Sequence, residues 1–338
     1  MPAPLPTRLG FDYPVIQAPI GSASCPALAA AVSDAGGLGM LALSWRSPAE
    51  ARAKIRATRQ LTQRPFGINL VLAWDMRERL EAALDEGVGI VSLAWGDPTP
   101  FTSIAHRAGA FVIQTVGSAE EAVRAKDSGV DAVVAQGWES GGHVLGEVAM
   151  SVLVPAVCDA VGPLPVIAAG GIADGRGIAA ALALGAEAVW IGTRFLATPE
   201  AHVHPSYRAR VLAARETDTV FSSLFDKGWP DAPHRTMRNS TVRAWEVAGR
   251  PDRPNRPGED DVVARGEDGR PIVRYEDAIP LPGTTGDCEA LALYAGQSAA
   301  LVGEVVPARE LVARLMRETT EALDRARGPG YHLHTPTR

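Results

Sequence analysis

The chain has 338 residues, of which 46% are hydrophobic and 21% are charged, and this balance excludes a disordered chain. Its formal net charge of −6 gives no basic field, so we expect neither nucleic acid nor a membrane as a partner. Three widely spaced cysteines and the lack of a basic-then-apolar leader pattern favour a reducing, cytoplasmic compartment.

Short apolar runs, rich in β-forming residues and bounded by Gly, Pro or Asp, recur along the first part of the chain. Such runs are typical of parallel strands that are buried on both faces. We predict eight strands, at residues 14–19, 37–43, 66–72, 89–95, 110–116, 131–137, 165–170 and 188–197.

The segments between these runs carry helix signals. Residues 118–129 begin with Ser118 and have Glu121 three positions later, which predicts a reciprocal capping box. Residues 75–87 and 174–185 each start at an Asp and stop at a Gly, as helices do. Alternating strands and helices require a parallel sheet with right-handed crossovers. Eight such units favour an α/β fold of the (β/α)8 TIM-barrel type over an open doubly wound sheet.

The alternation stops near Ala213. Residues 213–287 are rich in Pro, Gly, Arg and Asp and contain no readable βα unit, so we predict a smaller inserted substrate-side subdomain, or lid. Residues 1–212 would then form the barrel, and residues 288–326 would supply two helices that complete it. We expect residues 327–338 to be a loose tail. The C-terminal helices are also candidates for a homodimer interface.

Two consecutive predicted strands end in glycine-rich turns, Gly170–Gly171 and Gly192–Thr193. In a barrel these turns are neighbours on the C-terminal face. Backbone N–H groups and helix dipoles there can converge on a phosphate. The turns alone do not distinguish a phosphosugar from a flavin phosphate.

Carboxamide side chains lie at or near several predicted strand ends: Gln17, Asn69, Gln114 and Gln136. A single one is usually a satisfied polar residue. Together they offer uncharged donor and acceptor pairs, which suit the edge of a planar heterocycle such as an isoalloxazine ring. We therefore expect a flavin above the phosphate site.

Five motifs then occur in order: "QAPIGSASCPALAAAVSDAGGLGML", "GINLVL", "QGWESGGHVLG", "AAGGIADGRGIAAALALGAEAVWIGTRFLA" and "LYAGQSA". Together they resemble the nitronate monooxygenase family, formerly called 2-nitropropane dioxygenases, over residues 14–197 and 288–305. The resemblance implies a TIM-barrel flavoprotein with non-covalent FMN. Such an enzyme oxidises alkyl nitronates, and in some members neutral nitroalkanes, with O2 to carbonyl compounds and nitrite.

The resemblance also implies roles for individual residues. His143 would be the catalytic base or would help to place the substrate, and its titration near neutral pH suits both tasks. Glu139 would orient the loop by hydrogen bonding. Together with the glycine turns and carboxamides, the predicted FMN-binding set is Ala18, Pro19, Ile20, Asn69, Gln114, Gln136, Gly141, Gly142, Gly170, Gly171, Trp190, Ile191, Gly192, Thr193, Tyr294, Gln297 and Ser298.

His202 and His204 lack further nearby ligands, so we predict no metal site. One alternative function is an NAD(P)H-dependent FMN quinone or enoyl-thioester reductase on the same barrel. The shape of the insertion would decide between the two functions, because it must form either a small-anion pocket or a nicotinamide cleft. The other is a non-redox phosphate-binding barrel of the IMP dehydrogenase kind. That group needs a nucleophilic cysteine in the loop where this chain has His143.

Overall fold

The computed structural model describes residues 3–328, and its centre is a parallel eight-stranded sheet. The sheet order is β1-β9-β8-β6-β5-β4-β3-β2, and a parallel bridge between Ile16 and Leu38 joins the two edge strands into a barrel. All eight predicted strands are confirmed. Their bounds are β1 (Val15–Gln17), β2 (Gly39–Ala42), β3 (Phe66–Val71), β4 (Ile90–Ala94), β5 (Phe111–Val116), β6 (Ala132–Gln136), β8 (Val166–Ala169) and β9 (Ala188–Ile191).

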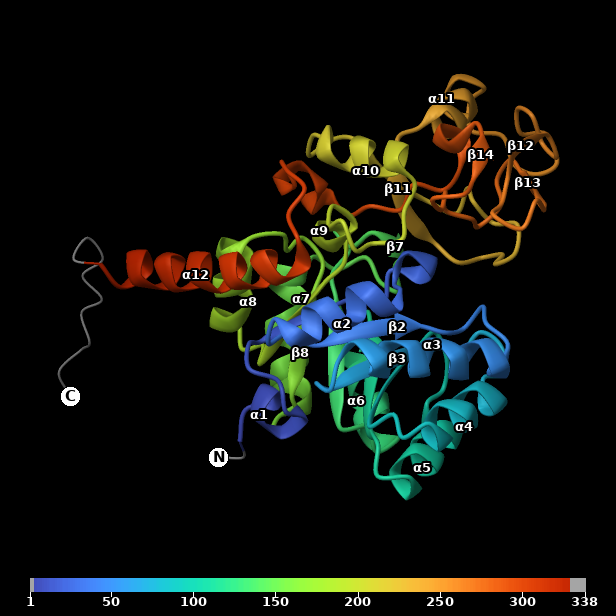
Figure 1. Cartoon of the computed structure of the whole chain (residues 1–338). Helices are drawn as coiled ribbons and strands as arrows, with labels where there is room; N and C mark the ends of the chain where they lie inside the picture. Colours follow the sequence, from blue (N-terminus) through green and yellow to red (C-terminus); the bar gives the residue numbers. More distant parts are fainter. Residues whose placement is uncertain (1–2, 329–338) are drawn as a thin grey trace.

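Helices surround the barrel (Figure 1). They are α2 (Pro26–Asp34), α3 (Pro48–Leu61), α4 (Arg77–Asp85), α5 (Thr99–Arg107), α6 (Ala119–Asp127), α7 (Met150–Val161), α8 (Gly175–Ala183) and α12 (Ala308–Arg327). The last helix, α12, packs against α8 and α2 and so fills the position that follows β9 in the ring. A long segment of chain therefore separates the last barrel strand from its own helix.

Three local predictions were wrong. The last strand ends at Ile191, because the chain turns at Gly192 into the short helix α9 (Thr193–Leu196). The capping box of α6 is only half formed: the Ser118 side chain accepts from Glu121 N–H, but the Glu121 carboxylate accepts from Gly117 N–H at 2.6 Å.

The third concerns the C-terminal segment, where α12 is the single α-helix and the chain before it makes only the 3-10 turns η2 (Cys288–Ala290) and η3 (Gln297–Leu301). Arg327 still belongs to α12, and the rest of the predicted tail beyond Gly328 lies outside the described residues.

The barrel strands alternate between two apolar clusters. One cluster fills the barrel interior and includes Ile16, Ile113, Val134 and Trp190. The larger cluster packs the opposite faces of the strands against the helices. The N-terminal helix α1 (Leu5–Leu9) contributes Leu5 to the interior cluster. This alternation of side chains decides which residue at each strand end can face a ligand above the barrel.

The insertion lies over the carboxyl ends of the barrel strands (Figure 1). Helix α10 (Pro205–Leu212) leads from the barrel into the insertion. The insertion's own elements are β10 (Thr219–Ser222), β11 (His234–Met237), α11 (Ser240–Val247), β12 (Val262–Arg265), β13 (Pro271–Val273) and β14 (Thr285–Gly286). They include two small antiparallel sheets, β13-β12-β14 and β10-β11-β7. Because β7 (Gly142–His143) comes from the barrel loop after β6, this loop is docked onto the insertion.

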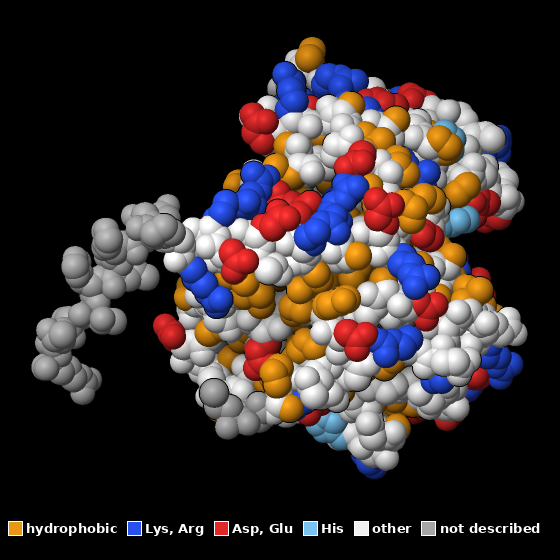
Figure 2. Space-filling model, turned by 60° about the vertical axis from the view of Figure 1, so that its left-hand side comes forward, with side chains coloured by type: hydrophobic (Ala, Val, Ile, Leu, Met, Phe, Trp, Pro, Cys, Tyr) orange, Lys and Arg blue, Asp and Glu red, His pale blue; other side chains and the backbone are white. Residues whose placement is uncertain are grey.

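Charged side chains of both signs are interspersed over the face seen in Figure 2, with apolar side chains between them. Among residues 3–328, no helix combines the length and the apolar character that crossing a membrane demands. The described surface thus agrees with the small net charge of the chain.

Candidate active site

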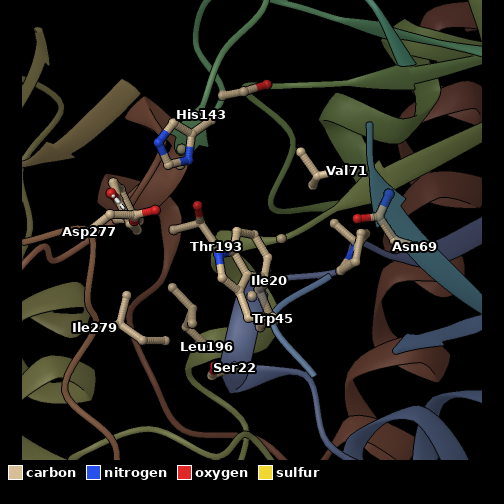
Figure 3. A pocket seen from close by; sticks show the side chains of 18 of the residues that line it. Ile20, Ser22, Trp45, Asn69, Val71, His143, Thr193, Leu196, Asp277 and Ile279 are labelled. Carbon is tan, nitrogen blue, oxygen red and sulfur yellow. Dashed lines mark hydrogen bonds between the residues drawn. The ribbon is translucent and has the colours of Figure 1, made fainter. Parts of the chain in front are cut away.

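A cavity of about 720 Å³ opens where the barrel strands end, between the barrel and the insertion. Its size lies in the range of small-molecule sites. Strand ends and loops of the barrel form one side, and Trp229, Asp277 and Tyr294 come from later in the chain. Figure 3 shows His143, Asp277 and Thr193 directed toward the same space, with Asn69 at the far side.

The structure brings most of the predicted residues together around this cavity. His143 lines it, as do Ala18, Pro19, Ile20, Asn69, Gln136, Gly141, Gly142, Gly170, Gly171, Trp190, Gly192, Thr193, Tyr294 and Ser298. Three predicted residues, Gln114, Ile191 and Gln297, are not among the lining residues.

Side-chain alternation explains two of the three. Ile113 faces the barrel interior, so Gln114 faces the helices, where its Nε2 donates to Gly96 O at 3.4 Å. Trp190 is interior and Ile191 packs in the outer cluster for the same reason. Gln17, like Gln114, does not line the cavity. It is fully buried, its Nε2 donates to Ser24 Oγ, and its Oε1 accepts from Met40 N–H. The expected group of four carboxamides on one face is therefore wrong for two of its members.

Two of the carboxamides line the cavity, Asn69 and Gln136. Both polar groups of the Gln136 side chain already form hydrogen bonds with the backbone. Its Nε2 donates to His143 O at 3.0 Å, and its Oε1 accepts from Leu145 N–H at 3.0 Å. Gln136 thereby holds both sides of the loop that carries the histidine. Asn69 donates more weakly, to the carbonyl and hydroxyl oxygens of Ser92 at 3.3 Å.

The loop after β6 is fixed at several points. As predicted, the Glu139 carboxylate accepts from a backbone group, Met150 N–H, at 3.0 and 3.2 Å. On the insertion side, β7 pairs with β11 so that His143 lies opposite His234. The buried Arg235 donates to Trp138 O at 2.9 and 3.3 Å, and its guanidinium lies 4.5 Å from the Trp138 ring centre. The insertion thus positions the histidine as well as covering it.

His143 is surrounded by aromatic rings. Its ring centre lies 4.1 Å from that of Trp229, 5.4 Å from that of Tyr294 and 5.4 Å from that of His234. Burial lowers the pKa of His143 well below its ordinary value, and the nearby His234 lowers it further. Its Nε2 atom is buried and has no hydrogen-bond partner within residues 3–328. A neutral imidazole with an unused nitrogen can accept a proton from, or hydrogen bond to, a bound molecule.

His234, in contrast, is fully committed. It is completely buried, its Nδ1 lies 3.0 Å from Ala232 O, and its Nε2 accepts from Phe225 N–H at 3.2 Å. This pair of contacts requires the neutral tautomer with the proton on Nδ1. Burial lowers the pKa of His234 to about 4. His234 is therefore part of the scaffold, whereas the Nε2 of His143 has no partner among the described residues.

The sequence analysis missed Asp277, which lines the cavity from the insertion. Its Oδ1 accepts from the Tyr294 hydroxyl at 2.6 Å, and burial raises the pKa of Asp277 to about 6. Burial and the adjacent Asp277 raise the pKa of Tyr294 well above its usual value, so the phenol stays protonated. Asp277 lies in the segment without periodic pattern, and the only signal in its favour was the insertion's expected place over the barrel.

The residues near the glycine turns form a cradle that suits a phosphate. Gly170 and Gly171 have φ angles of +100° and +72°, and a Cβ on Gly170 would come within 2.7 Å of Ser140 Oγ. Ser140 Oγ is buried and has no hydrogen-bond partner in the described part of the chain. A backbone free of side chains beside an unused hydroxyl donor can accept an anionic oxygen close to the main chain.

The C-terminal segment is tied to the same cradle. Gly296 N–H donates to Thr193 Oγ1 at 3.0 Å, and Gln297 N–H donates to Glu139 O at 2.9 Å. Gln297 therefore contributes backbone at the site although its side chain does not line the cavity.

The two histidines after α9 have other partners. His202 Nε2 lies 3.3 Å from Glu267 Oε1, and His204 Nδ1 accepts from Ser206 N–H at the start of α10. Among the described residues, no three His, Cys, Asp or Glu side chains come together to hold a metal ion.

An eight-stranded parallel barrel with a ligand-sized cavity at the carboxyl ends of its strands defines a TIM-barrel enzyme. The family model for nitronate monooxygenase matches residues 4–78 and 72–318, which is nearly the whole chain. The chain therefore belongs to the nitronate monooxygenase family, whose members are flavin-dependent oxidoreductases acting on small molecules. This membership excludes the non-redox barrel alternative.

Individual relatives differ in their named activities. A nitronate monooxygenase of Paraburkholderia phytofirmans is 33% identical over 94% of this chain and 95% of its own length. A (3aS,4S,5R,7aS)-5-hydroxy-7a-methyl-1-oxo-octahydro-1H-indene-4-carboxyl-CoA dehydrogenase of Rhodococcus jostii is 40% identical over 71% of this chain and 67% of that protein. The structure of FabK from Thermotoga maritima superposes with a TM-score of 0.83 at 35% identity, covering 97% and 99% of the two chains.

Proposed function

We propose that this protein uses FMN to oxidise alkyl nitronates with O2 to carbonyl compounds and nitrite. The observation that carries the proposal is the neutral His143, which lines the cavity above the barrel and whose buried Nε2 has no hydrogen-bond partner among the described residues. The family membership and the Paraburkholderia relative support the same reaction.

FMN fits the residues that are present. The backbone at Gly170, Gly171 and Gly192 with the hydroxyl of Ser140 would hold the phosphate, and Ala18 to Ile20 and Asn69 would border the ring. When bound, the flavin supplies the redox chemistry, accepting electrons from the substrate and passing them to oxygen.

The protein's own residues bind and orient the substrate. His143 is neutral, so its Nε2 can take a proton from the carbon next to a nitro group, which extends the substrates to neutral nitroalkanes. With the proton on Nε2, it donates a hydrogen bond to a nitronate oxygen instead. The surrounding Trp229, Tyr294 and His234 exclude water from this nitrogen. Asp277 would carry a proton when the anionic nitronate binds, because two negative charges in one buried pocket repel each other.

The test uses the purified protein with its bound flavin, without oxygen. One portion is mixed with ethyl nitronate and another with NADH or NADPH, and the visible flavin absorbance is followed. Fast loss of flavin absorbance with the nitronate, and slow change with the nicotinamides, is the expected result. Fast reduction by a nicotinamide with no response to nitronate would overturn the proposal, as would a colourless protein that takes up no FMN.

The second candidate is an FMN-dependent oxidoreductase of acyl thioesters or quinones that exchanges electrons with NAD(P)H. The Rhodococcus relative, named as a CoA-ester dehydrogenase, favours it. The same absorbance experiment separates the two candidates, because only this one requires reduction by a nicotinamide.

A further inference from the structure

Four of the chain's seven tryptophans lie together, and two of them, Trp95 and Trp229, lie beside His143. Trp45, Trp74 and Trp95 follow β2, β3 and β4, whereas Trp229 comes from the insertion. The Trp229 ring centre lies 4.1 Å from that of His143, 5.1 Å from that of Trp95 and 5.0 Å from that of Trp74. The Trp45 ring centre lies 6.0 Å from that of Trp74 and 6.2 Å from that of Trp229. We call these four residues the tryptophan strip.

The strip runs from the buried centre to the solvent. Trp229 is only 6% exposed, whereas Trp74 is 36% and Trp45 is 47% exposed. Trp45, Trp95 and Trp229 line the cavity, and Figure 3 places Trp45 beside Ile20 and Ser22. Large indole surfaces left in water are unfavourable for a folded chain, so a ligand that covers them would gain binding free energy.

The rings meet at steep angles. The interplanar angle is 66° between Trp45 and Trp74 and 69° between Trp95 and Trp229. In such edge-to-face pairs each ring presents a face that its neighbour does not cover. The strip therefore offers several separate faces on which a flat group can stack.

The backbone at Trp95 is unusual. Trp95 has a φ of +61°, and it is the only non-glycine residue with a positive φ in the described chain before the insertion. A bulky side chain in the left-handed region is strained, and such strain persists where surrounding contacts hold a functional group in place. The left-handed backbone at Trp95 turns the chain directly after β4 and so places the Trp95 ring in the strip.

We propose that the tryptophan strip binds a planar aromatic or fused-ring apolar group of the substrate, attached to the carbon that reacts beside His143. The inference rests on the proposed function for the reacting end and adds the class of substrate. A small alkyl nitronate would occupy only the space near His143 and leave Trp45 uncovered.

The kinetic test compares the nitronates of nitroethane and of phenylnitromethane. The quantity of interest is the ratio of kcat/KM for the aryl over the ethyl substrate, because intrinsic reactivity cancels between protein variants. We expect Trp45→Ala to lower this ratio about tenfold and Trp45→Phe to restore most of it. Trp74 packs on Trp45 and Trp229 but does not line the cavity, so Trp74→Ala should lower the ratio by a smaller factor. Leu61→Ala, an exposed apolar residue at the end of α3, is the matched control and should leave the ratio unchanged. An unchanged ratio in both tryptophan variants would overturn the proposal.

A binding test does not require turnover. The holoprotein is titrated with 2-naphthoate and, in parallel, with acetate, and the heat of binding is measured. We expect 2-naphthoate to bind at least about tenfold more tightly than acetate, and this advantage to shrink in the Trp45→Ala and Trp74→Ala variants. Equal affinity for the two acids, or an advantage that neither variant reduces, would overturn the inference. Tighter binding of phenyltrimethylammonium than of 2-naphthoate would also overturn it, since the strip would then be a cation site.

The two tests separate the two proposals. Failure to oxidise any nitronate, with naphthoate binding that depends on the strip, removes the proposed function and leaves the subsite. Nitronate oxidation that does not depend on Trp45 or Trp74 supports the proposed function and removes the subsite. Both tryptophans are exposed enough that their variants should fold, which a thermal unfolding curve verifies.

Discussion

The guanidinium of Arg235, on the insertion, donates two hydrogen bonds to the carbonyl oxygen of Trp138, on the barrel loop that leads to His143. The same guanidinium lies over the Trp138 ring, and the neighbouring His234 pairs with His143 across the small sheet. Arg235 is 2% exposed, so these contacts replace the water that would otherwise solvate its positive charge. The insertion therefore fixes the backbone of the loop that carries His143.

Arg235→Gln is expected to loosen this loop. The shorter, neutral amide loses the bidentate contact and the ring stacking, so we expect kcat with ethyl nitronate to fall about tenfold with a smaller change in KM. Steady-state kinetics measures both constants. Arg243→Gln, an exposed arginine of the same insertion that pairs with Glu289, is the matched control and should change neither. Equal kcat in the two variants would show that Arg235 does not position the loop.

His143→Gln tests the predicted base. Glutamine keeps a hydrogen-bonding group near the Nε2 position but cannot take up a proton. We expect kcat/KM for neutral nitroethane to fall about 100-fold or more, and that for ethyl nitronate to fall only about tenfold, since the nitronate needs no deprotonation. Kinetics with both substrates separates the two effects. Equal losses for the two substrates would assign His143 to substrate placement alone.

Asp277 should make nitronate binding depend on pH. Because burial raises the pKa of Asp277 to about 6, its carboxyl is neutral below this pH and negative above it. The negative form repels an anionic substrate, so the KM for ethyl nitronate should rise as the pH increases from about 5 to about 8. In Asp277→Asn the amide stays neutral and can still accept from Tyr294, so the KM profile should flatten. A wild-type profile that the substitution leaves intact would exclude Asp277 as its cause.

The barrel was predictable because its signals are local and repeated. Each strand is a short apolar run bounded by breakers, and the glycines at 170 and 171 mark a place where the backbone must approach a ligand. The motif around His143 likewise indicated a loop that lines the cavity, and its catalytic role stays a prediction. The outward direction of Gln114 and Ile191 could also have been predicted. Each comes directly after a residue that faces the barrel interior, Ile113 or Trp190, and neighbouring side chains of a strand point to opposite faces.

Asp277 and the tryptophan strip could not be predicted in this way. Trp45, Trp74 and Trp95 sit in three separate loops, and nothing in their spacing indicates that they meet. Trp229 and Asp277 belong to an insertion whose strands are set by docking onto β7 and not by a periodic pattern. Their positions follow from tertiary contacts across the cavity, which local sequence does not encode.

His234 should make the stability of the fold sensitive to mild acid. Burial lowers the pKa of His234 from its ordinary value of 6.5 to about 4, so between these pH values the unfolded chain binds a proton that the folded chain does not. The resulting contribution to the free energy of unfolding is roughly 3 kcal/mol. It is fully present above about pH 6.5 and is lost as the pH falls toward about 4. Urea unfolding at several pH values should show a shallower pH dependence for His234→Asn than for the wild type. A pH dependence in His234→Asn that is as steep as that of the wild type would show that His234 is not its cause.

At Gly141 the loop that carries His143 lies close to the backbone of the C-terminal segment. A Cβ at this position would lie 2.3 Å from Gly296 N and 2.5 Å from the carbonyl carbon of Ala295, both of which are backbone atoms. Gly141→Ala must therefore push the two segments apart, at a cost of about 1–3 kcal/mol in the free energy of unfolding. Because both segments border the predicted flavin site, we expect FMN to bind about tenfold more weakly, as measured by flavin fluorescence on titration of the apoprotein. Gly303→Ala, whose Cβ would meet nothing within 4 Å, should leave both quantities unchanged, and a Gly141→Ala protein that behaves like it would show that the two segments are not packed as described.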